Sequence, residues 1–580
     1  MKKVLSVLLT LALVANLTAI VFVNAVATES QQTKVFNFLD SYTAEELAEL
    51  TADPDDYYVS VFVEFAYPEM DTDGLDELDR PSRNAAIRNY HMMQNLAIAT
   101  QLGIPADAIS SYAPYAELRY ESIAAYEAAE DFVYSLGESE DVQDVEIELC
   151  IPEDCDATKA TNPSSSQFSF SQAFEAVGIT DTGYDGTGIR VGVMEQHIPD
   201  DRDHIPIGHY VNYGDVEGDH ATRVTQILVG DLGVAEDIFF YCVSTESFYT
   251  SDMGSELDSY PFTFRYALEW LMDNHVDIVN ISYGLYTTGL YDNRAAYIDY
   301  LISTTGCTFV LAAGNSGEFS DTDARKNCVA SPATSASAIT VGAINAQNQV
   351  TYQSPYITVS FGNNKPDLVA PGENILFPWA LGTIPKSGTS YAAPIVSGIA
   401  ARLMQEYPIL KTKPYLLKAV LLASCTNLPG QDEQIDTYAG CGLVNYARAR
   451  SIMASESYFY YEKPANNYPN GVYLFDTFIN YVPAGRTVNL HYTVQIPGAF
   501  CSVEETDTSG SPFAFSKFKL HLYDQETNQK VADPYNVDIK GSLPFEINYV
   551  SVSNYQLVAY MYENNHPTQK EYIAFAYTYD

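Results

Sequence analysis

The sequence predicts an α/β fold in which helices cover both faces of a parallel sheet. Short apolar strands alternate with helical segments between residues 165 and 452, a pattern typical of strands that are buried on both sides. One of these helices has an apolar stripe, because Phe264, Leu268 and Leu271 stand at i, i+4 and i+7. The length of 580 residues and the hydrophobic content of 47% suffice for several packed domains. The predicted strands are 189–194, 276–281 and 308–312.

The first 27 residues have the three parts of a signal peptide. Two lysines precede an apolar stretch, and small residues stand at Ala25 and Ala27. We therefore expect export, with cleavage after Ala25 or Ala27. An uncleaved anchor is the alternative, because the apolar stretch is long for a signal peptide. No later segment is apolar enough to span a bilayer.

Residues 28–160 are expected to form a small α/β unit in the order strand, helix, strand, helix, strand. Apolar residues alternate over 59–65, as they do in a half-buried strand. Helices are predicted at 83–102 and 124–136, and a last alternating strand at 145–149.

A linker and a β-rich region flank the central segment. Residues 155–171 are rich in Ser, Thr, Asn and Pro, a composition typical of an exposed linker, so we expect cleavage between about 150 and 165. Beyond residue 453, alternating strands such as 488–492 and 518–522 dominate, and they predict a β-sandwich.

The composition excludes some partners. The 30 Lys and Arg against 75 Asp and Glu give a net charge of -45, which repels phosphate backbones and anionic membrane surfaces. We expect no nucleic-acid partner and no membrane contact after signal cleavage. None of the eight cysteines stands in an array with zinc-ligand spacing. Disulfides and buried free thiols both stay open. The pairs that are close in sequence are Cys150 with Cys155, Cys307 with Cys328, and Cys425 with Cys441.

The most specific local pattern is SGTSYAAP at 387–394, which precedes an apolar helical run. Ser390 opens this helix, Gly388 permits a tight turn before it, and backbone N–H groups at a helix start can bind a developing oxyanion. This pattern favours a nucleophilic serine. A helix-capping serine before Pro394 would explain a Ser at this position but not the whole octet.

A nucleophilic serine needs an adjacent base. His220, in DHATRVTQILVG, precedes an apolar helical run that would hold the imidazole rigidly. Taken alone, a histidine is more often a surface or core residue.

Two further polar residues stand at the ends of apolar strands. The run IRVGVMEQ ends in Glu195, an acid that could orient the histidine, although strand ends are often polar simply because they meet water. In FVLAAGNSG, Asn315 could donate its amide to an oxyanion, or it could be a turn residue.

Together these segments resemble the subtilisin-like (subtilase) peptidase family, in the order acid, His, Asn, Ser. SGTSYAAP matches the family's serine motif almost letter for letter, and AAGNSG matches its Asn motif. HATRV resembles HGTHV, with Ala221 in place of Gly and Arg223 in place of the second His. NISYG at 280–284 resembles the substrate-binding strand, and KPDLVAPG at 365–372 resembles the stretch before the serine motif. The resemblance spans residues 165–452.

The main departure is Glu195, because the family normally has Asp there. The extra methylene displaces the carboxylate by roughly an ångström, and a misplacement on that scale can cost about 10²-fold in rate. Asp200 and Asp201 lie downstream as substitutes but not at the strand tip, so Glu195 is the expected acid.

The resemblance implies a serine endopeptidase. In this interpretation Glu195 orients His220, His220 activates Ser390, and Asn315 binds the oxyanion. The reaction requires no cofactor. Many members bind structural calcium, for which the acidic loops 200–203 and 321–323 are candidates, but no metal ligand is assigned. Substrate would lie against Ser282, Tyr283, Gly284, Ala312, Ala313 and Gly314.

The family layout also gives a meaning to the flanking regions. It implies a signal peptide at 1–27, an inhibitory propeptide at 28–160, a catalytic domain at 165–452 and a β-rich C-terminal domain at 453–580. The expected partners are protein or peptide substrates and the propeptide itself, acting as an intramolecular inhibitor. The expected location is outside the cell, in solution or at the cell surface.

Two alternatives from other classes stay open. A catalytically impaired pseudoprotease would explain Glu195 and the altered surroundings of His220, but it leaves the intact serine and Asn motifs without a purpose. A surface adhesion protein could use residues 453–580 while the middle of the chain serves as a scaffold.

Overall fold

The computed structural model describes most of the chain. The expected signal peptide (1–27), most of the expected linker (152–166) and the acidic residues 201–203 and 321–323 lie outside the described residues. The described residues are 34–52, 57–68, 70–71, 74–151, 167–180, 183–200, 210–214, 217–245, 264–287, 289–317, 327–358, 365–379, 382–431, 437–463, 473–482, 487–494, 517–524, 530–532, 542–548, 553–563 and 571–579.

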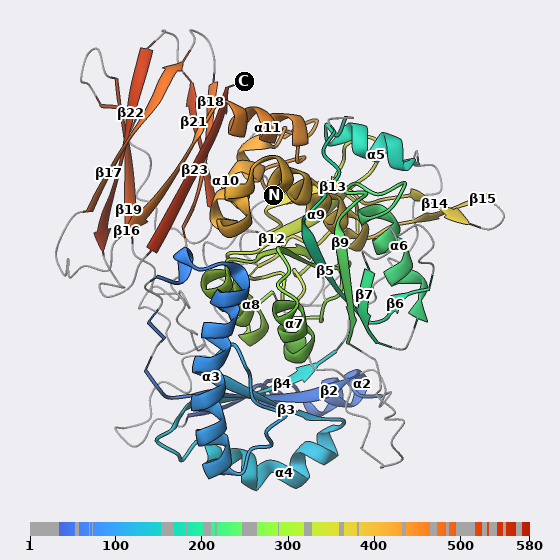
Figure 1. The fold of residues 1–580 in the computed structure, drawn as a ribbon. Helices are drawn as coiled ribbons and strands as arrows, with labels where there is room; N and C mark the ends of the chain where they lie inside the picture. Colours follow the sequence, from blue (N-terminus) through green and yellow to red (C-terminus); the bar gives the residue numbers. More distant parts are fainter. Residues whose placement is uncertain are drawn as a thin grey trace, which may run out of the picture.

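An N-terminal unit contains a four-stranded sheet and two longer helices (Figure 1). Its elements are β1 (Val35–Asn37), η1 (Phe38–Ser41), α2 (Ala44–Leu50), β2 (Tyr58–Phe65), η2 (Leu75–Glu77), α3 (Arg80–Leu102), β3 (Tyr115–Tyr120), α4 (Ile123–Leu136) and β4 (Val142–Cys150). The strand order is β1-β4-β2-β3, and β1 is parallel to β4. The expected order of elements is present from β2 to β4. Sequence periodicity missed β1 and α2 because both are short.

The helices of this unit begin and end where local chemistry dictates. The side chain of Asp79 accepts a hydrogen bond from the backbone N–H of Ser82 and so caps α3. The helix ends at Gly103, whose φ of 75° places it in the left-handed region that favours glycine. Ser122 caps α4 in the same way, through the N–H of Ala125.

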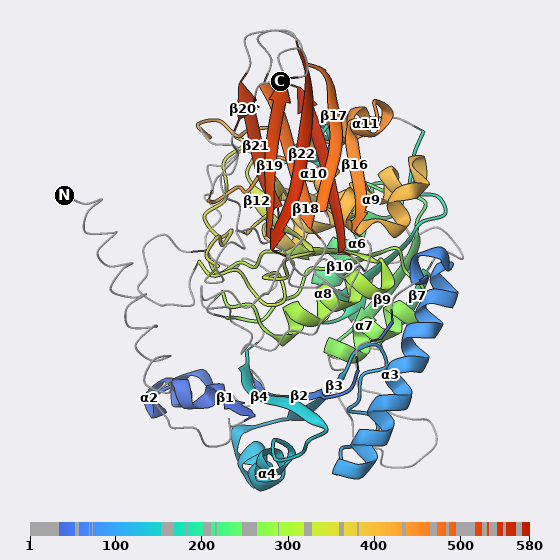
Figure 2. The ribbon, with the colours of Figure 1, turned by 90° about the vertical axis from the view of Figure 1, so that its left-hand side faces the viewer.

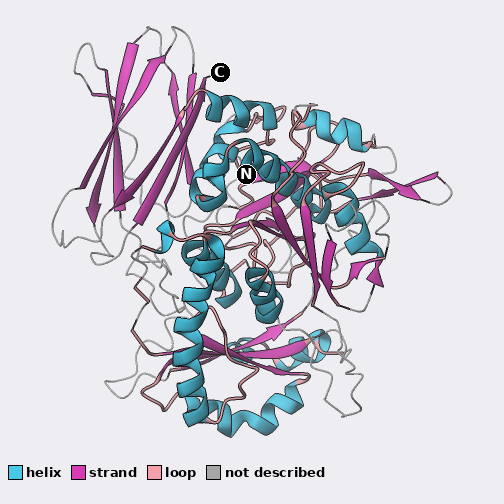
Figure 3. Cartoon of the chain, in the orientation of Figure 1, coloured by secondary structure: helices cyan, strands magenta, loops and turns pink. Residues whose placement is uncertain are grey.

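The central domain is built on a seven-stranded sheet, which Figure 3 shows among its helices. Its strands are β5 (Arg190–Glu195), β7 (Tyr210–Tyr213), β9 (Phe239–Ser244), β10 (Ile278–Ile281), β11 (Thr308–Ala312), β12 (Ile339–Ile344) and β13 (Leu368–Pro371). The order is β13-β12-β11-β10-β5-β9-β7, and every pairing is parallel. All residues of β10 to β13 are buried, as expected for a sheet covered on both faces. The predicted α/β class is therefore confirmed.

The described helices of the central domain lie around this sheet. They are α5 (Phe170–Ala176), α6 (Asp219–Leu228), α7 (Phe264–Asp273), α8 (Asn293–Thr305), α9 (Thr389–Glu406), α10 (Pro414–Ser424) and α11 (Tyr446–Ala454). The long helix α9 contacts β10 to β13 and also α6. On the other side, α7 and α8 lie between the sheet and the N-terminal unit (Figure 1). The apolar stripe Phe264, Leu268 and Leu271 is buried, which confirms that prediction.

Short elements complete the central domain. They are β6 (Ile198–Pro199), β8 (Glu217–Gly218), β14 (Ile375–Trp379), β15 (Gly382–Lys386) and η3 (Pro408–Thr412). Strands β14 and β15 pair antiparallel and form a hairpin directly before α9. Near β13, Lys365 donates to the carbonyl of Ala338 and to the carboxylate of Asp367. Burial lowers the pKa of Lys365 to about 7.

The C-terminal part consists of two four-stranded sheets. The strands are β16 (Tyr458–Lys463), β17 (Tyr473–Val482), β18 (Thr487–Val494), β19 (Lys517–Asp524), β20 (Lys530–Ala532), β21 (Ser542–Asn548), β22 (Ser553–Glu563) and β23 (Glu571–Tyr579). The orders are β16-β23-β18-β21 and β17-β22-β19-β20, with antiparallel pairing throughout. Figure 2 shows these sheets and the N-terminal unit at opposite ends of the central domain.

The six described cysteines are all buried free thiols, and no described helix is long and apolar enough to cross a membrane. Two of the pairs considered from sequence, Cys307 with Cys328 and Cys425 with Cys441, are therefore not joined in this structure. Cys155, the partner considered for Cys150, lies outside the described residues.

Candidate active site

The carboxyl edge of the sheet gathers residues that are far apart in sequence. Strand β5 ends at Glu195, and its neighbour β10 is followed by Ser282. Since Ile281 pairs with Met194, Ser282 comes level with Glu195. In the sheet, β7 and β9, which follow β5 in the chain, lie on one side of β5, and β10 to β13 lie on its other side. Sites in α/β sheets form at such a switch point.

Glu195 and His220 form a polar pair at this edge. Their Oε2 and Nδ1 atoms are 2.8 Å apart. Glu195 is 1% exposed, and its backbone carbonyl accepts a hydrogen bond from Thr245. His220 lies in the first turn of α6. With Nδ1–H donating to the carboxylate, Nε2 is left as the basic nitrogen of a neutral ring.

Asp200, the substitute acid considered from sequence, is bound elsewhere. Its backbone N–H donates to the Oγ1 of Thr222 at 2.9 Å, and the hydroxyl of Thr222 donates to its carboxylate. Of the two described acids, Glu195 is therefore the one that contacts His220.

Ser390 occupies the second position of α9 and is 2% exposed. Its hydroxyl donates to the backbone carbonyl of Ser282 at 3.1 Å. In return, the hydroxyl of Ser282 donates to the carbonyl of Ser390 at 3.0 Å. These reciprocal bonds fix the start of α9 against the end of β10.

Two buried polar residues extend this connection; sequence reasoning noted Asn280 only as part of the motif NISYG and did not single out Ser397. The amide of Asn280 donates to the Oγ of Ser282 at 2.9 Å, and the hydroxyl of Ser397 donates to the amide oxygen of Asn280 at 2.9 Å. Both are fully buried. A polar side chain inside the apolar strand IVNI was the available signal, since such groups are retained when they are hydrogen-bonded.

Asn315 is also tied to the segment that carries Ser390. Its amide oxygen accepts a hydrogen bond from the backbone N–H of Thr389 at 3.0 Å. The hydroxyl of Thr389 donates to the carbonyl of Gly314 at 2.8 Å. Gly314 has a φ of 107°, a conformation that other residues rarely adopt. Because the amide oxygen of Asn315 accepts from Thr389, the NH2 group of the same amide points away from Thr389.

Aromatic rings pack beside the histidine. The rings of His220 and Tyr391 have centroids 5.5 Å apart, and those of Tyr391 and Phe377 are 5.2 Å apart. Tyr391 is fully buried. Helix α9, which Ser390 opens, thus contacts the ring of His220 through its next residue.

The residues expected to bind substrate lie at the ends of β10 and β11. Beyond β10, Leu285 pairs with Ser331 through two backbone hydrogen bonds. Beyond β11, the N–H of Ala313 donates to Val341, and its carbonyl accepts from Ala330. The structure thus places the six expected positions Ser282, Tyr283, Gly284, Ala312, Ala313 and Gly314 along one edge of the sheet.

No group of acidic, histidine or cysteine side chains among the described residues has the arrangement of a metal site. The two loops considered for calcium are described only at Asp200, whose carboxylate binds Thr222.

A parallel α/β sheet with a carboxylate–histidine pair at its edge and a serine opening the adjacent helix belongs to the class of serine hydrolases. The comparisons define this class further. Residues 175–442 match the model of the subtilase family. The chain thus carries a subtilase domain, and the enzyme is a subtilisin-like serine protease.

The relatives are similar at modest identity. Subtilisin DY of Bacillus licheniformis is 26% identical over 281 residues, which cover 46% of this chain and 92% of that protein. Subtilisin-like protease 2 of Arthroderma otae is 33% identical over 198 residues, which cover 32% of this chain and 41% of that protein. Neither finding favours the pseudoprotease or adhesion alternatives.

Solved structures are similar in fold. The prenylagaramide maturation protease PagA is 24% identical, with a TM-score of 0.38, and the match covers 49% of this chain and 97% of that chain. Fervidolysin from Fervidobacterium pennivorans is 16% identical, with a TM-score of 0.45, and the match covers 86% of this chain and 68% of that chain.

Proposed function

We propose that the protein is a secreted, self-processing serine endopeptidase whose triad is Glu195, His220 and Ser390. The observation that carries this proposal is the 2.8 Å contact between Glu195 Oε2 and His220 Nδ1, at the sheet edge where Ser390 opens α9. The catalytic roles are assigned by analogy with the subtilisins, and the contacts in this chain indicate which residues fill them.

The proposed reaction uses each group at a defined atom. His220 Nε2 takes the proton of the Ser390 hydroxyl as Oγ attacks a peptide carbonyl. The proton then passes to the leaving amine, and water hydrolyses the acyl-enzyme with His220 again as the base. The Asn315 NH2 group and the backbone N–H of Ser390 would stabilise the oxyanion. No cofactor takes part in these steps, and structural calcium stays an unassigned possibility.

The longer acid is compatible with this assignment. A Glu in place of Asp extends the side chain by one methylene, yet Glu195 reaches His220 at an ordinary hydrogen-bond distance of 2.8 Å. Its carboxylate is buried, so the contact is shielded from water.

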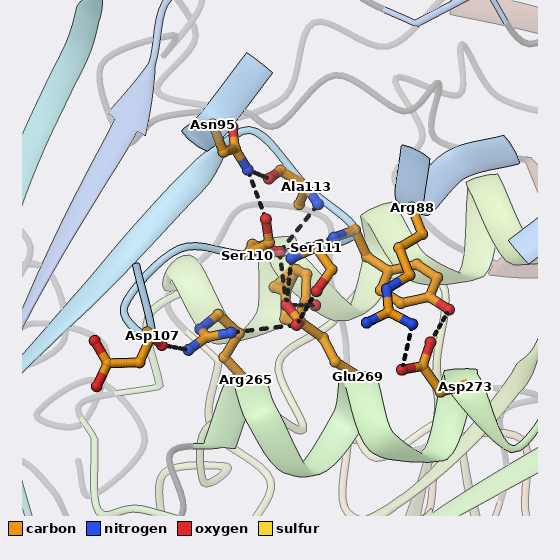
Figure 4. Close-up of polar contacts among 11 residues, drawn as sticks. Arg88, Asn95, Asp107, Ser110, Ser111, Ala113, Arg265, Glu269 and Asp273 are labelled. Atoms are coloured by element: carbon orange, nitrogen blue, oxygen red, sulfur yellow. Dashed lines mark hydrogen bonds and ion pairs between the residues drawn. The ribbon is translucent and has the colours of Figure 1, made fainter. Parts of the chain in front are cut away.

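Contacts between the N-terminal unit and the central domain support a role of this unit as an inhibitory propeptide, and Figure 4 shows one group of them. The carboxylate of Glu269 on α7 accepts hydrogen bonds from the hydroxyls of Ser110 and Ser111, both at 2.8 Å, and from the N–H of Ser111 at 3.0 Å. On the same helix, Arg265 donates to Glu269 at 3.2 Å and also to the carbonyl of Asp107.

A second group of contacts lies at the carboxyl ends of α7 and α8. Arg83 of α3 donates to the carbonyls of Thr304 and Ser303, and Asn84 donates to the carbonyl of Met272 at 2.7 Å. The last carbonyls of a helix have no partner within it, and cations there oppose the helix dipole favourably. The N-terminal unit therefore supplies hydrogen-bond donors to the last carbonyls of two helices of the catalytic domain.

The end of the unit leads toward the active site. The carbonyl of Ile151, one residue beyond β4, accepts a hydrogen bond from the N–H of Tyr286 at 2.9 Å. Tyr286 is only four positions after Ser282 in the chain. This path supports self-cleavage in the expected stretch between about 150 and 165.

The test uses the full chain as wild type, Ser390→Ala, Glu195→Ala and Glu195→Asp, with hydrolysis of an unfolded protein and labelling by an organophosphorus reagent as readouts. We expect label on Ser390 and hydrolysis in the wild type, neither in Ser390→Ala, and a loss of at least about 10²-fold in Glu195→Ala. Labelling at another residue, or equal activity in Ser390→Ala, would overturn the proposal.

A further inference from the structure

Arg223 stands where the sequence departs from the family pattern, and the structure gives it an extended set of contacts. It is 2% exposed. Its Nη2 lies 2.7 Å from the carboxylate of Asp219, and its Nη1 donates to the carbonyl of Pro378 and to the side chain of Gln226, both at 3.0 Å. Pro378 belongs to β14, so Arg223 joins the helix of His220 to the β14–β15 hairpin.

A chain of rings leads from the same guanidinium back to the histidine. The Cζ of Arg223 is 5.7 Å from the centroid of the Phe377 ring. Phe377 packs on Tyr391, and Tyr391 packs on His220, with centroid distances of 5.2 and 5.5 Å. A shift of β14 would therefore be transmitted to the imidazole of His220.

Asp219 connects the segment that carries His220 with the strand that precedes Ser390. It directly precedes His220, and its second oxygen lies 3.2 Å from the Nζ of Lys386. Lys386 ends β15, four positions before Ser390. The same carboxylate thus links the start of α6 to the strand that leads into α9.

We infer that Arg223 is a positioning residue that sets the imidazole of His220 relative to Ser390 by fastening α6 to the β14–β15 hairpin. Its planar guanidinium serves a carboxylate, a carbonyl, an amide oxygen and an aromatic face at once, which a lysine cannot do. Without it, Asp219 would be held by Lys386 alone and the Phe377–Tyr391 pair would lose its outer support. This inference rests on the proposed function.

The experiment compares the self-processed forms of wild type, Arg223→Lys, Arg223→Met, Asp219→Asn and Arg402→Met. Rates on a peptide substrate are divided by the concentration of active sites titrated with an organophosphorus reagent, so that misfolded protein does not count. Arg402 is the matched control, because it is a buried arginine of α9 that donates to the carbonyl of Val234.

We expect Arg223→Met to lower kcat per active site by about 10²-fold, the cost of a misplacement of about 1 Å. KM should stay within about 3-fold, since Arg223 is not among the proposed substrate-binding residues. Arg223→Lys should recover part of kcat, and Asp219→Asn should lose roughly 3- to 10-fold. Arg402→Met should lower thermal stability and leave kcat per active site unchanged.

Two outcomes would overturn the inference. One is an Arg223→Met enzyme with kcat per active site within about 2-fold of wild type, whatever its stability. If that variant does not fold, the other is an unchanged kcat in both Arg223→Lys and Asp219→Asn. An inactive wild type would instead refute the proposed function, so the two failures are distinguishable.

Discussion

Both flanking parts of the chain contribute buried apolar residues to the core of the catalytic domain, but the N-terminal unit adds the larger set of described polar contacts. Beside apolar residues such as Ile87 and Tyr115, which belong to the main core, the N-terminal unit uses donors such as Arg83 and Ser110, which bind helix carbonyls and a buried carboxylate. The C-terminal sheets use Ala574 and Ala576, which are fully buried and belong to the main apolar core. Polar partners can exchange each other for water on separation, whereas apolar surfaces cannot. The larger share of polar contacts in the N-terminal unit is consistent with its expected role as a removable propeptide.

The largest effect is expected at the apolar interface. Ala576→Arg would place a charge without a partner against α10, at a cost of about 3–5 kcal/mol in the free energy of unfolding. The measurement is thermal unfolding of the full chain in the Ser390→Ala background. Ala454→Arg is the matched control, because Ala454 is exposed at the end of α11. Equal unfolding temperatures for the two variants would contradict the comparison.

A smaller effect is expected at the polar interface. Arg83→Ala removes hydrogen bonds from a charged donor to the end of α8, each worth about 1.5–3 kcal/mol. The binding constant of the cleaved N-terminal unit should therefore weaken by at least about 10-fold, measured as inhibition of the processed enzyme. The processed enzyme alone should keep its kcat, since Arg83 lies in the released unit. A change below about 2-fold would show that these contacts do not hold the unit.

The polar interface should also weaken in acid because of His91. This histidine of α3 is 1% exposed, and its two nitrogens lie 2.7 Å from the hydroxyls of Tyr67 and Tyr300. Tyr67 donates to Asn95, so it accepts from Nδ1–H, and Nε2 accepts from Tyr300 of α8. The third neighbouring group, Tyr90, packs on the ring edge-on.

Burial lowers the pKa of His91 to about 3 from its usual 6.5. On separation His91 loses Tyr300 and part of its burial, so its pKa rises toward the ordinary 6.5, while the closed interface resists protonation until about pH 3. Stability of the interface is therefore full above pH 6.5 and falls by up to about 1.4 kcal/mol per unit as the pH drops toward 3. We expect His91→Gln, which can donate and accept without titrating, to remove this part of the pH dependence of binding. An identical pH dependence in wild type and variant would contradict the expectation.

The smallest effect is expected for an exposed ion pair in the same interface. Arg88 and Asp273 lie 3.0 Å apart, but their side chains are 48% and 36% exposed. Such pairs contribute about 0.2–1 kcal/mol, and salt screens them. Arg88→Ala should weaken binding of the N-terminal unit by less than about 5-fold, with no effect at high salt. A loss as large as that of Arg83→Ala would remove the distinction between buried and exposed contacts.

Patterns in the sequence predicted the parallel sheet and the segments that line its edge, because strand periodicity and short motifs are local properties. Glu195, Ser282 and Asn315 each follow an apolar strand, and parallel strands bring their carboxyl ends together. The roles assigned to these residues stay predictions until the variants are measured.

Contacts that depend on register and packing could not be predicted. Ser282 and Ser390 form hydrogen bonds because the end of β10 packs against the start of α9, and the pairing of β10 with β5 brings the same edge beside Glu195. The binding of Asp200 to Thr222 depends in the same way on how α6 packs on β6. The residues of the β14–β15 hairpin do not alternate between apolar and polar clearly enough to predict strands. Arg223 was noted only as a departure from the family's His motif.

The most direct test of this account is the intact mass of the full chain over time, for wild type and Ser390→Ala. Ser390→Ala keeps the size of the site and removes only the proposed nucleophile. We predict that the wild type shortens by one cut in the stretch between about 150 and 165, while Ser390→Ala keeps its full mass. Cleavage of both at the same rate, or of neither under varied pH and calcium, would contradict the central claim.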